Sequence, residues 1–363
     1  MEFKQSNHPT LSRTTCTRDG LGVIPMLIDS STDKLLEDTS RSFYLTLKIL
    51  PKKIRGQVGL LYLLARIADT IADSKVGEAE MLIESLKMYE ESVKDSSINI
   101  PDLEPIAKLQ EDQGEQRLLR NVSQVVSSLS KFSSADKTRI LRCLKIIIAG
   151  QTLDLERFGP ANDSQEISAL QTPDEMDDYA YRVAGSVGEF WTSMTLAHLV
   201  RADGPKEEKM FDLGVKFGKS LQMINILRDI PEDLRFGRCY IPEQLLKEHD
   251  LNPEDLLEAT NMSKFRDLYH HHLDITDGHL RAAEEYIMLL PRTQFRLRVA
   301  CLLPVLIGQK TVNLLRSRNV LDSTDRVKVQ RKTVKRLMLK SVLSTLIPGG
   351  AARLLKNNRK IRQ

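Results

Sequence analysis

Two pairs of aspartates, each with its members four residues apart, are the residues of this chain best suited to chemistry. Asp69 and Asp73 form the first pair, and Asp229 and Asp233 form the second. On a helix, side chains four residues apart project from the same face. If two such helices face each other, the four carboxylates can bind Mg²⁺ ions, which in turn hold a diphosphate. The pattern therefore indicates metal-assisted chemistry on a diphosphate substrate.

Each pair continues a polar stripe on an otherwise apolar helix. Tyr62 and Arg66 precede the first pair at helical spacing, and Gln222 and Asn225 precede the second. Helices that are apolar around most of their circumference are buried, and burying a polar group without a partner costs roughly 2–7 kcal/mol. Cations must therefore neutralise the aspartates. Metal ions are one source, and the neighbouring Arg66 and Arg228 are the other, which would make both stripes structural ion-pair networks.

Four segments resemble motifs of the head-to-head prenyl synthases, the family of squalene, dehydrosqualene and phytoene synthases. They are SRSF (40–43), YLLARIADTIAD (62–73), DDYAYRVAGSVGE (177–189) and NILRDIPEDLRFGRCYIP (225–242). The last is similar to the family's second aspartate motif and the Gly-Arg after it, without a gap. The resemblance runs from about Ser40 to Leu339 and implies an all-α fold, a single large helical domain of the isoprenoid synthase type with a central apolar cavity.

The resemblance also implies a reaction. Two farnesyl diphosphates, or longer prenyl diphosphates, condense head to head through a cyclopropyl (presqualene) diphosphate, with Mg²⁺ assisting loss of diphosphate. Catalysis is assigned to the four aspartates and to Tyr179, which matches a tyrosine that helps to remove a proton; without the match, a core aromatic is its commoner role. The implied metal ligands are Asp69, Asp73, Asp229, Asp233 and Asn225. The implied substrate contacts are Arg41, Ser42, Phe43, Tyr62, Arg66, Gln222, Asn225, Arg228 and Arg238.

Two further features bear on the shape of the site. Small side chains recur in the middle segment, where they leave room for a prenyl tail or allow close helix packing: Ala180, Ala184, Gly185, Ser186 and Gly188. Pro231 lies inside the second aspartate pair and has no N–H to donate. It predicts a kink that tilts Asp233 relative to Asp229.

Three local features favour squalene as the product, made by a further reduction with NADPH. Thr70 directly follows the first aspartate, as in squalene synthases, and the segment 296–312 resembles their helix with a Cys-x-x-Pro. VKVQRK (327–332) is similar to the segment implicated there in NADPH use, which makes Lys328 and Arg331 candidate contacts to the 2′-phosphate of that cofactor.

Other features leave alternatives open. Ala300 stands where many squalene synthases have an aromatic residue, and CYIP (239–242) reads more like phytoene synthases. The alternative product is therefore dehydrosqualene or phytoene, without reduction. A terpene cyclase or chain-elongating prenyltransferase also uses paired acidic motifs, but the VAG and Gly-Arg segments argue against both. A non-catalytic assembly factor would have lost the aspartates, and all four are present.

Composition predicts one large helical domain, residues 31–325, between a flexible N-terminal segment (1–30) and a basic C-terminal tail (326–363). The chain has 18 glycines and 14 prolines among its 363 residues, a low share that is typical of a helix-rich protein. The four cysteines have no paired or metal-binding spacing and no secretory signal is evident, which indicates a reducing, cytoplasmic setting.

The basic tail is the part of the chain with an expected interaction of its own. It contains Lys and Arg but no acidic residue from Arg326 to Arg362. Its apolar stretch is interrupted by charge, proline and glycine, so it is no spanning helix. A peripheral contact with the inner face of an anionic membrane is one reading, and a docked or frayed solvated end is the other. Basic residues confined to one end do not indicate nucleic-acid binding, and we expect a monomer.

Overall fold

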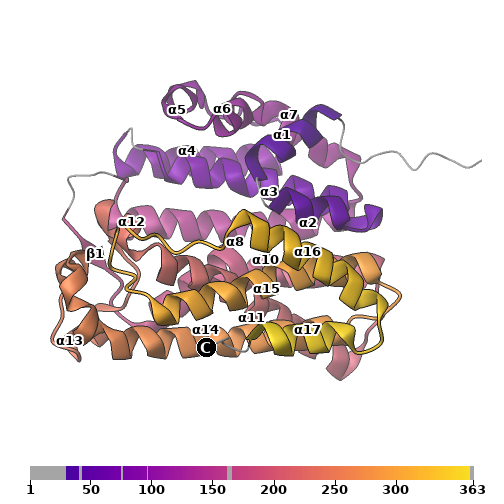
Figure 1. The fold of residues 1–363 in the computed structure, drawn as a ribbon. Coiled ribbons are helices and arrows are strands. Elements are labelled where there is room, and N and C mark those ends of the chain that lie inside the picture. Colours follow the sequence, from indigo (N-terminus) through magenta and orange to yellow (C-terminus); the bar gives the residue numbers. More distant parts are fainter. Residues whose placement is uncertain (1–29, 41–42, 75–76, 96, 162–165, 360–363) are drawn as a thin grey trace, which may run out of the picture.

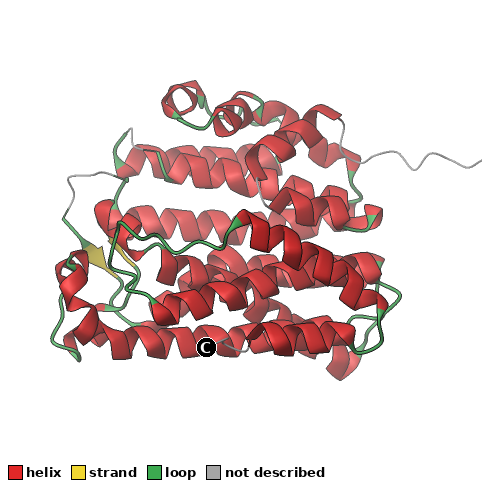
Figure 2. Ribbon diagram, viewed as in Figure 1, coloured by secondary structure: helices red, strands yellow, loops and turns green. Residues whose placement is uncertain are grey.

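The structure is a computed structural model that describes residues 30–40, 43–74, 77–95, 97–161 and 166–359, and this part of the chain is almost entirely helical (Figure 1, Figure 2). Its strands, β1 (Ser168–Ala169) and β2 (Arg238–Cys239), are two residues long and pair in parallel, with Ser168 opposite Arg238. The prediction of an all-α fold is confirmed.

Long helices form the core. α11 packs against α10 and α14, α14 packs against α15, and α3 packs against α8. α3 is apolar on most of its circumference, and its leucines and isoleucines are almost all buried, each contributing about 1.5–3 kcal/mol. The polar residues at its end therefore lie in a largely apolar setting. The core helices are α3 (Lys52–Ala72), α8 (Ser134–Phe158), α10 (Ser186–His198), α11 (Gly204–Arg228), α14 (Met262–Leu289) and α15 (Phe295–Ser317).

Shorter elements cover the core and close its ends. The N-terminal ones lie together on one side, at the top of Figure 1 in indigo and purple. They are α1 (Ser30–Ser40), α2 (Phe43–Ile49), α4 (Ala79–Lys94), α5 (Glu104–Leu109), α6 (Gln113–Arg120), α7 (Val122–Ser127) and η1 (Ser128–Lys131). The others are α9 (Pro173–Ala180), η2 (Tyr181–Gly185), α12 (Ile230–Arg235), α13 (Glu243–Lys247), η3 (Pro253–Leu257) and η4 (Ala259–Asn261).

The small residues of the middle segment let α10 and α11 approach backbone to backbone. A Cβ on Gly188 would lie 1.9 Å from the carbonyl oxygen of Gly214, and one on Gly218 would lie 2.0 Å from that of Ala184. Between α9 and α10 the helix widens into a π-helical turn, η2, a feature that often marks functional sites. Close packing is thus one use of these small residues.

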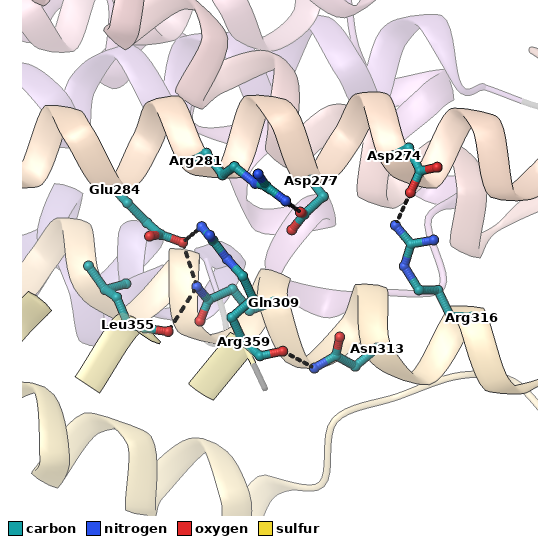
Figure 3. Close-up of polar contacts among 9 residues, drawn as sticks. All are labelled: Asp274, Asp277, Arg281, Glu284, Gln309, Asn313, Arg316, Leu355 and Arg359. Carbon is teal, nitrogen blue, oxygen red and sulfur yellow. Dashed lines mark hydrogen bonds and ion pairs between the residues drawn. The ribbon is translucent and has the colours of Figure 1, made fainter. Parts of the chain in front are cut away.

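The C-terminal segment is docked on the core. α16 (Arg331–Leu346) and α17 (Gly350–Arg359) both pack against α15. Figure 3 shows Glu284 of α14 accepting hydrogen bonds from Gln309 of α15, at 2.7 Å, and from Arg359. The part of the basic tail that the structure describes is therefore a fixed layer of the helical body.

The helix crossing generates the first prediction. We expect Gly188→Ala to lower the free energy of unfolding by roughly 1–3 kcal/mol, because the added methyl group meets backbone that cannot move aside. Gly278→Ala is the matched control, since a Cβ there meets nothing within 4 Å on α14, and it should stabilise the protein by about 0.5–1 kcal/mol. Urea unfolding of both variants measures this, and equal effects would contradict the close crossing.

Candidate active site

The first aspartate pair lies where α3 ends. Asp69 is in the last turn, and Asp73 is the residue after the helix, its N–H donating to the carbonyl of Asp69 at 2.8 Å. Gln151 of α8 donates to Asp69 Oδ1 at 2.5 Å. Burial of the carboxyl group and the negative charge of Asp73 raise the pKa of Asp69 to about 7. The two carboxylates are thus close enough to repel each other.

The second pair spans a break between two helices. Asp229 is both the C-cap of α11 and the N-cap of α12. Pro231 lies in the first turn of α12 and has no N–H with which to continue α11, so the predicted kink is a change of helix. The N–H of Asp233 still donates to the carbonyl of Asp229 at 2.9 Å. Asp73 and Asp229 thus each directly follow the last turn of a helix, and the four-residue spacing of both pairs is kept by a backbone hydrogen bond between their members.

Arginines hold one aspartate of each pair. Arg238 Nη1 donates to Asp73 Oδ1 at 3.0 Å. Arg228 Nε donates to Asp229 Oδ1 at 2.9 Å, and Arg326 Nη2 donates to the same oxygen at 3.0 Å. The ion-pair alternative is thus realised at Asp73 and Asp229.

Asp69 and Asp233 are less completely neutralised. Arg66 Nη1 lies 3.8 Å from Asp69 Oδ2, beyond hydrogen-bonding distance. Burial and the negative charge of Asp229 raise the pKa of Asp233 well above its ordinary value. These two carboxyl groups therefore lack the close guanidinium contact that their partners have.

Arg238 joins the two halves of the site. The side chain is 9 % exposed, and the nearby Tyr240, Asp73 and Asp154 raise its pKa in spite of its burial. The charge of Asp73 in turn adds to the raised pKa of Asp233, so the end of α3 faces α12. The structure thus brings all four predicted aspartates into one electrostatic neighbourhood.

Tyr179, the predicted proton acceptor, belongs to a buried chain of hydroxyl groups. Its ring stacks on Tyr240 with centroids 4.6 Å apart, and its hydroxyl donates to that of Tyr240 at 3.2 Å. Tyr240 donates in turn to Asp154 Oδ2 at 2.6 Å. Burial raises the pKa of Asp154 to about 6, and its Oδ1 has no hydrogen-bond partner among the described residues. This series of hydrogen-bonded hydroxyl groups therefore ends on a carboxyl group that can accept a proton.

Sequence reasoning missed Gln151, Asp154 and Tyr240. Gln151 and Asp154 lie three residues apart on α8, so both face the site, and each is buried. Two polar residues at helical spacing, after the apolar run KIIIAG, are a signal that the sequence did contain. Tyr240 was visible only as part of the motif after Gly-Arg.

The predicted substrate contacts on α3 lie beside the site. Tyr62 donates to the carbonyl of Thr39 at 3.0 Å, and its ring centroid is 5.4 Å from that of Phe43. Arg66 pairs with Glu115 of α6, another residue that sequence reasoning missed. Arg41 and Ser42 lie outside the described residues.

On α11, the predicted contacts follow the helix towards Asp229. Asn225 Nδ2 lies 3.5 Å from Gln222 Oε1, the limit of a hydrogen bond, so these two amides are only weakly engaged with each other. Both can accept a contact from a ligand. Their spacing puts them on the face that leads to the second aspartate pair.

An apolar cavity of about 260 Å³ adjoins the acidic end. Tyr62 and Ala65 of α3 and Leu221 of α11 line it, and Asp69 and Asp229 lie one and two turns further along in the sequence, at the C-terminal ends of these helices. The predicted small residues divide, since Ala184 and Gly188 line the cavity, whereas Ala180, Gly185 and Ser186 are not among its lining. The remaining lining residues are Phe43, Thr46, Val58, Leu61, Ile147, Val187, Phe190, Trp191, Gly214, Phe217, Gly218, Tyr286, Ala300, Cys301 and Pro304.

The aspartate oxygens fit a magnesium site in which the substrate diphosphate supplies the remaining ligands. Aspartate oxygens are hard donors. The repulsion of Asp69 by Asp73 and of Asp233 by Asp229 favours the binding of a cation. No cluster of three or more His, Cys, Asp or Glu that could hold a metal on its own occurs in the described ranges. Mg²⁺ usually takes only one or two carboxylates and fills its coordination with water and substrate phosphate. The aspartates are therefore suited to Mg²⁺ that arrives with a diphosphate.

The residues expected to contact NADPH do not build a comparable site. Lys328 and Arg331 are exposed. A surface groove of about 710 Å³ runs nearby, lined by Arg228, Arg235 and Arg326 but by neither of these residues. The NADPH contact therefore stays a prediction, and no step is derived through it.

Comparison with known proteins places this site in a family. The family model for squalene/phytoene synthase matches residues 36–333. A bifunctional lycopene cyclase/phytoene synthase of Gibberella fujikuroi is 27% identical over 262 residues, covering 70% of this chain and 41% of that protein. A 15-cis-phytoene synthase of Synechocystis sp. is 25% identical over 257 residues, covering 70% of this chain and 67% of its own. The chain thus spans about two fifths of the length of the bifunctional relative.

Solved structures share the fold. A complex of TcSQS with a ligand superposes with a TM-score of 0.74 at 19% identity, covering 90% of this chain and 89% of the other. A dehydrosqualene synthase in complex with a ligand gives a TM-score of 0.59 at 20% identity, covering 86% and 94%. At these identities the likeness is one of architecture.

The buried carboxyl group of Asp154 generates a prediction about stability and pH. Because its folded-state pKa is about 6, against 3.8 for an ordinary aspartate, the folded state holds the proton more tightly, and stability is lost as pH rises from about 4 to above 6. Asp154→Asn removes that loss. The free energy of unfolding of this variant minus that of the parent should therefore rise between pH 4 and pH 8, by at most about 3 kcal/mol.

Asp136, at the other end of α8, is the matched control. It is also buried, but hydrogen bonds from Gln57 and His198 outweigh its burial and lower its pKa. Asp136→Asn should therefore show the opposite sign, with a stability deficit that grows as pH rises from below the folded pKa to above the ordinary one. Urea unfolding at several pH values measures both, and the same sign in the two variants would contradict the assignment.

Proposed function

Since the chain belongs to the squalene/phytoene synthase family, we propose that it joins two prenyl diphosphates head to head and releases a linear product of the phytoene or dehydrosqualene type, without reduction. The observation that carries the proposal is that α3 and α11 both run from the apolar cavity to the acidic end of the site. Each helix lines the apolar cavity and leads at its C-terminal end to an aspartate pair, with Asp233 on the adjoining α12. An acidic end suits diphosphates, and an apolar cavity suits their prenyl chains.

Loss of diphosphate is the first step of the proposed reaction. The allylic C–O bond breaks, the electron pair leaves with the diphosphate, and an allylic cation remains. Arg66, Arg228 and Arg238 lie among the aspartates and are suited to bind phosphate oxygens. Bound Mg²⁺, held by Asp69, Asp73, Asp229 and Asp233 with Asn225 as a further oxygen donor, would supply Lewis-acid neutralisation of the leaving group.

Joining the chains through the cyclopropane requires the loss of one proton, and opening that ring to the linear product then requires loss of the second diphosphate, rearrangement of the resulting cation and loss of a second proton. The alkene of the second prenyl diphosphate attacks the cation, and closure of the cyclopropane releases a proton from carbon. Tyr179 can take this proton while its own passes to Tyr240, whose proton passes to Asp154. Asp154 then ends neutral, which its buried site favours. In this scheme Tyr240 and Asp154 are positioning and relay residues behind Tyr179.

In the proposed reaction, the apolar cavity shields the allylic cation from water. Its lining is almost wholly apolar, with Phe43, Phe190, Trp191 and Phe217 among its aromatic residues. Aromatic faces stabilise nearby cations, and the absence of water prevents the cation from being trapped as an alcohol.

The curated relatives support a product of the phytoene type, since those compared above carry phytoene synthase in their names. Squalene, made with NADPH, is the second candidate. It draws on the exposed Lys328 and Arg331 and on the segment around them, of which Arg326 and Val327 line the groove of about 710 Å³ but Lys328 and Arg331 do not.

The proposal is tested by product analysis. Purified protein is incubated with Mg²⁺ and with farnesyl or geranylgeranyl diphosphate, each with and without NADPH, and the extracted lipids are identified by mass spectrometry. We expect a hydrocarbon of twice the substrate's carbon number, the same with and without NADPH. Squalene formed only with NADPH would support the second candidate, and no release of diphosphate from either substrate would overturn both.

The aspartates give a matched set of variants. Asp69→Asn and Asp229→Asn should each lower kcat by at least about 10²–10³-fold, the typical effect of losing one electrostatic contact in an active site, with circular dichroism unchanged. Asp277→Asn is the control, because Asp277 pairs with Arg281 on α14, away from the site (Figure 3). It should keep full activity. Loss of helical signal in both site variants would instead favour purely structural ion pairs.

A further inference from the structure

The outer face of α16 is apolar in its C-terminal half. Leu339, Leu343 and Leu346 are 60%, 52% and 66% exposed, and Ile347, directly after the helix, is 54% exposed. Spacings of four and three put the three leucines on one side of the helix. Together with Leu109 of α5, the three leucines and Ile347 are the most exposed large apolar side chains in the described part of the chain. Such a patch marks an interaction surface.

The same face is basic from Lys332 to Lys340. Lys332, Lys335, Arg336 and Lys340 are all exposed, and at 100° per residue they share the side of the helix that carries the leucines. No hydrogen bond or ion pair engages these four cations within the described ranges. The chain has no acidic residue from Arg326 onwards, so nothing in this segment neutralises them.

The opposite face is held on the core, which fixes the direction of the exposed one. Leu337 and Ser341 are buried, and α16 packs along α15. α17 is tied down at its end, where Asn358 donates to the carbonyl of Leu306 at 2.9 Å and Arg359 pairs with Glu284 (Figure 3). The basic and apolar surface is therefore a permanent feature of the folded protein.

We propose that this surface, Lys332 to Ile347 of α16, binds the surface of a bilayer that contains anionic phospholipid. Leucines that enter the interface and cations that contact lipid phosphates are the two halves of an interfacial amphipathic helix. An acidic protein partner would use the cations but leave the leucines, which extend beyond them, unexplained. Charge complementarity thus selects anionic lipid as the occupant.

The location of the surface suits the proposed product, and this one argument rests on the proposed function. α15 lies under α16 and supplies Ala300, Cys301 and Pro304 to the wall of the apolar cavity. Although α15 is apolar and long enough to cross a membrane, 72% of its most apolar stretch is buried inside the protein, so it belongs to the core. The bilayer would then lie next to the cavity wall, where a water-insoluble hydrocarbon needs an acceptor.

The test is sedimentation of the full chain with vesicles of phosphatidylcholine alone or with one quarter phosphatidylglycerol. We expect binding to the anionic vesicles that weakens as salt is raised. Leu343→Glu with Leu346→Glu should lower the partition coefficient at least about tenfold. Lys335→Gln, Arg336→Gln and Lys340→Gln together should lower it on the order of a hundredfold on anionic vesicles. Leu109→Glu, at an equally exposed leucine on α5 (52%), is the control and should bind as the parent does.

Equal binding of parent and α16 variants, or no binding of the parent to anionic vesicles, would overturn the proposal. Sedimentation velocity without lipid serves as a second check, because a dimer that the Leu343→Glu, Leu346→Glu variant dissociates would assign the face to a second copy of the chain. Thermal unfolding verifies that the variants fold. Vesicle binding needs no substrate, and synthase activity is measured separately in detergent, so failure of the lipid proposal and failure of the proposed function give different results.

Discussion

Negative charge is concentrated where the ends of α3, α11 and α12 face one another, and the interactions of the surrounding residues depend on it. Asp69 and Asp233 carry raised pKa values because each is partly buried beside another aspartate. Arg228, Arg238 and Arg326 neutralise the other two carboxylates but leave this strain in place. A site that stability alone had shaped would pair every buried charge. In the proposed function, the remaining deficit of positive charge is what would attract a cation and a diphosphate to the acidic end.

The sequence was sufficient for features that depend on spacing within one helix. It placed the aspartates, it located the break at Pro231, and it indicated small residues where Gly188 meets Gly214. The resemblance to a family singled out Tyr179 among the tyrosines. The predictions of helix geometry succeed because helical periodicity and backbone chemistry are local, whereas the role of Tyr179 stays a prediction.

Contacts between distant segments were beyond that reasoning. Tyr240 meets Asp154 across 86 positions of the chain, and Arg66 meets Glu115 across 49. Such pairs depend on how α8, α6 and β2 pack, which no local pattern encodes. That α3 ends at Ala72, directly before Asp73, was not predicted for a related reason, because the exact residue at which a helix ends depends on tertiary contacts as much as on propensity. The features that favoured squalene were likewise short segments, and the relatives favour another product.

Arg326 gives the site a mechanical link to the outer layer of the molecule. It holds both Asp229 and Glu232, and it lies only a few residues before α16. A ligand of the Asp229 carboxylate would compete with this guanidinium, which would still be paired with Glu232. One side chain thus connects the acidic end of the site to the segment that leads into α16.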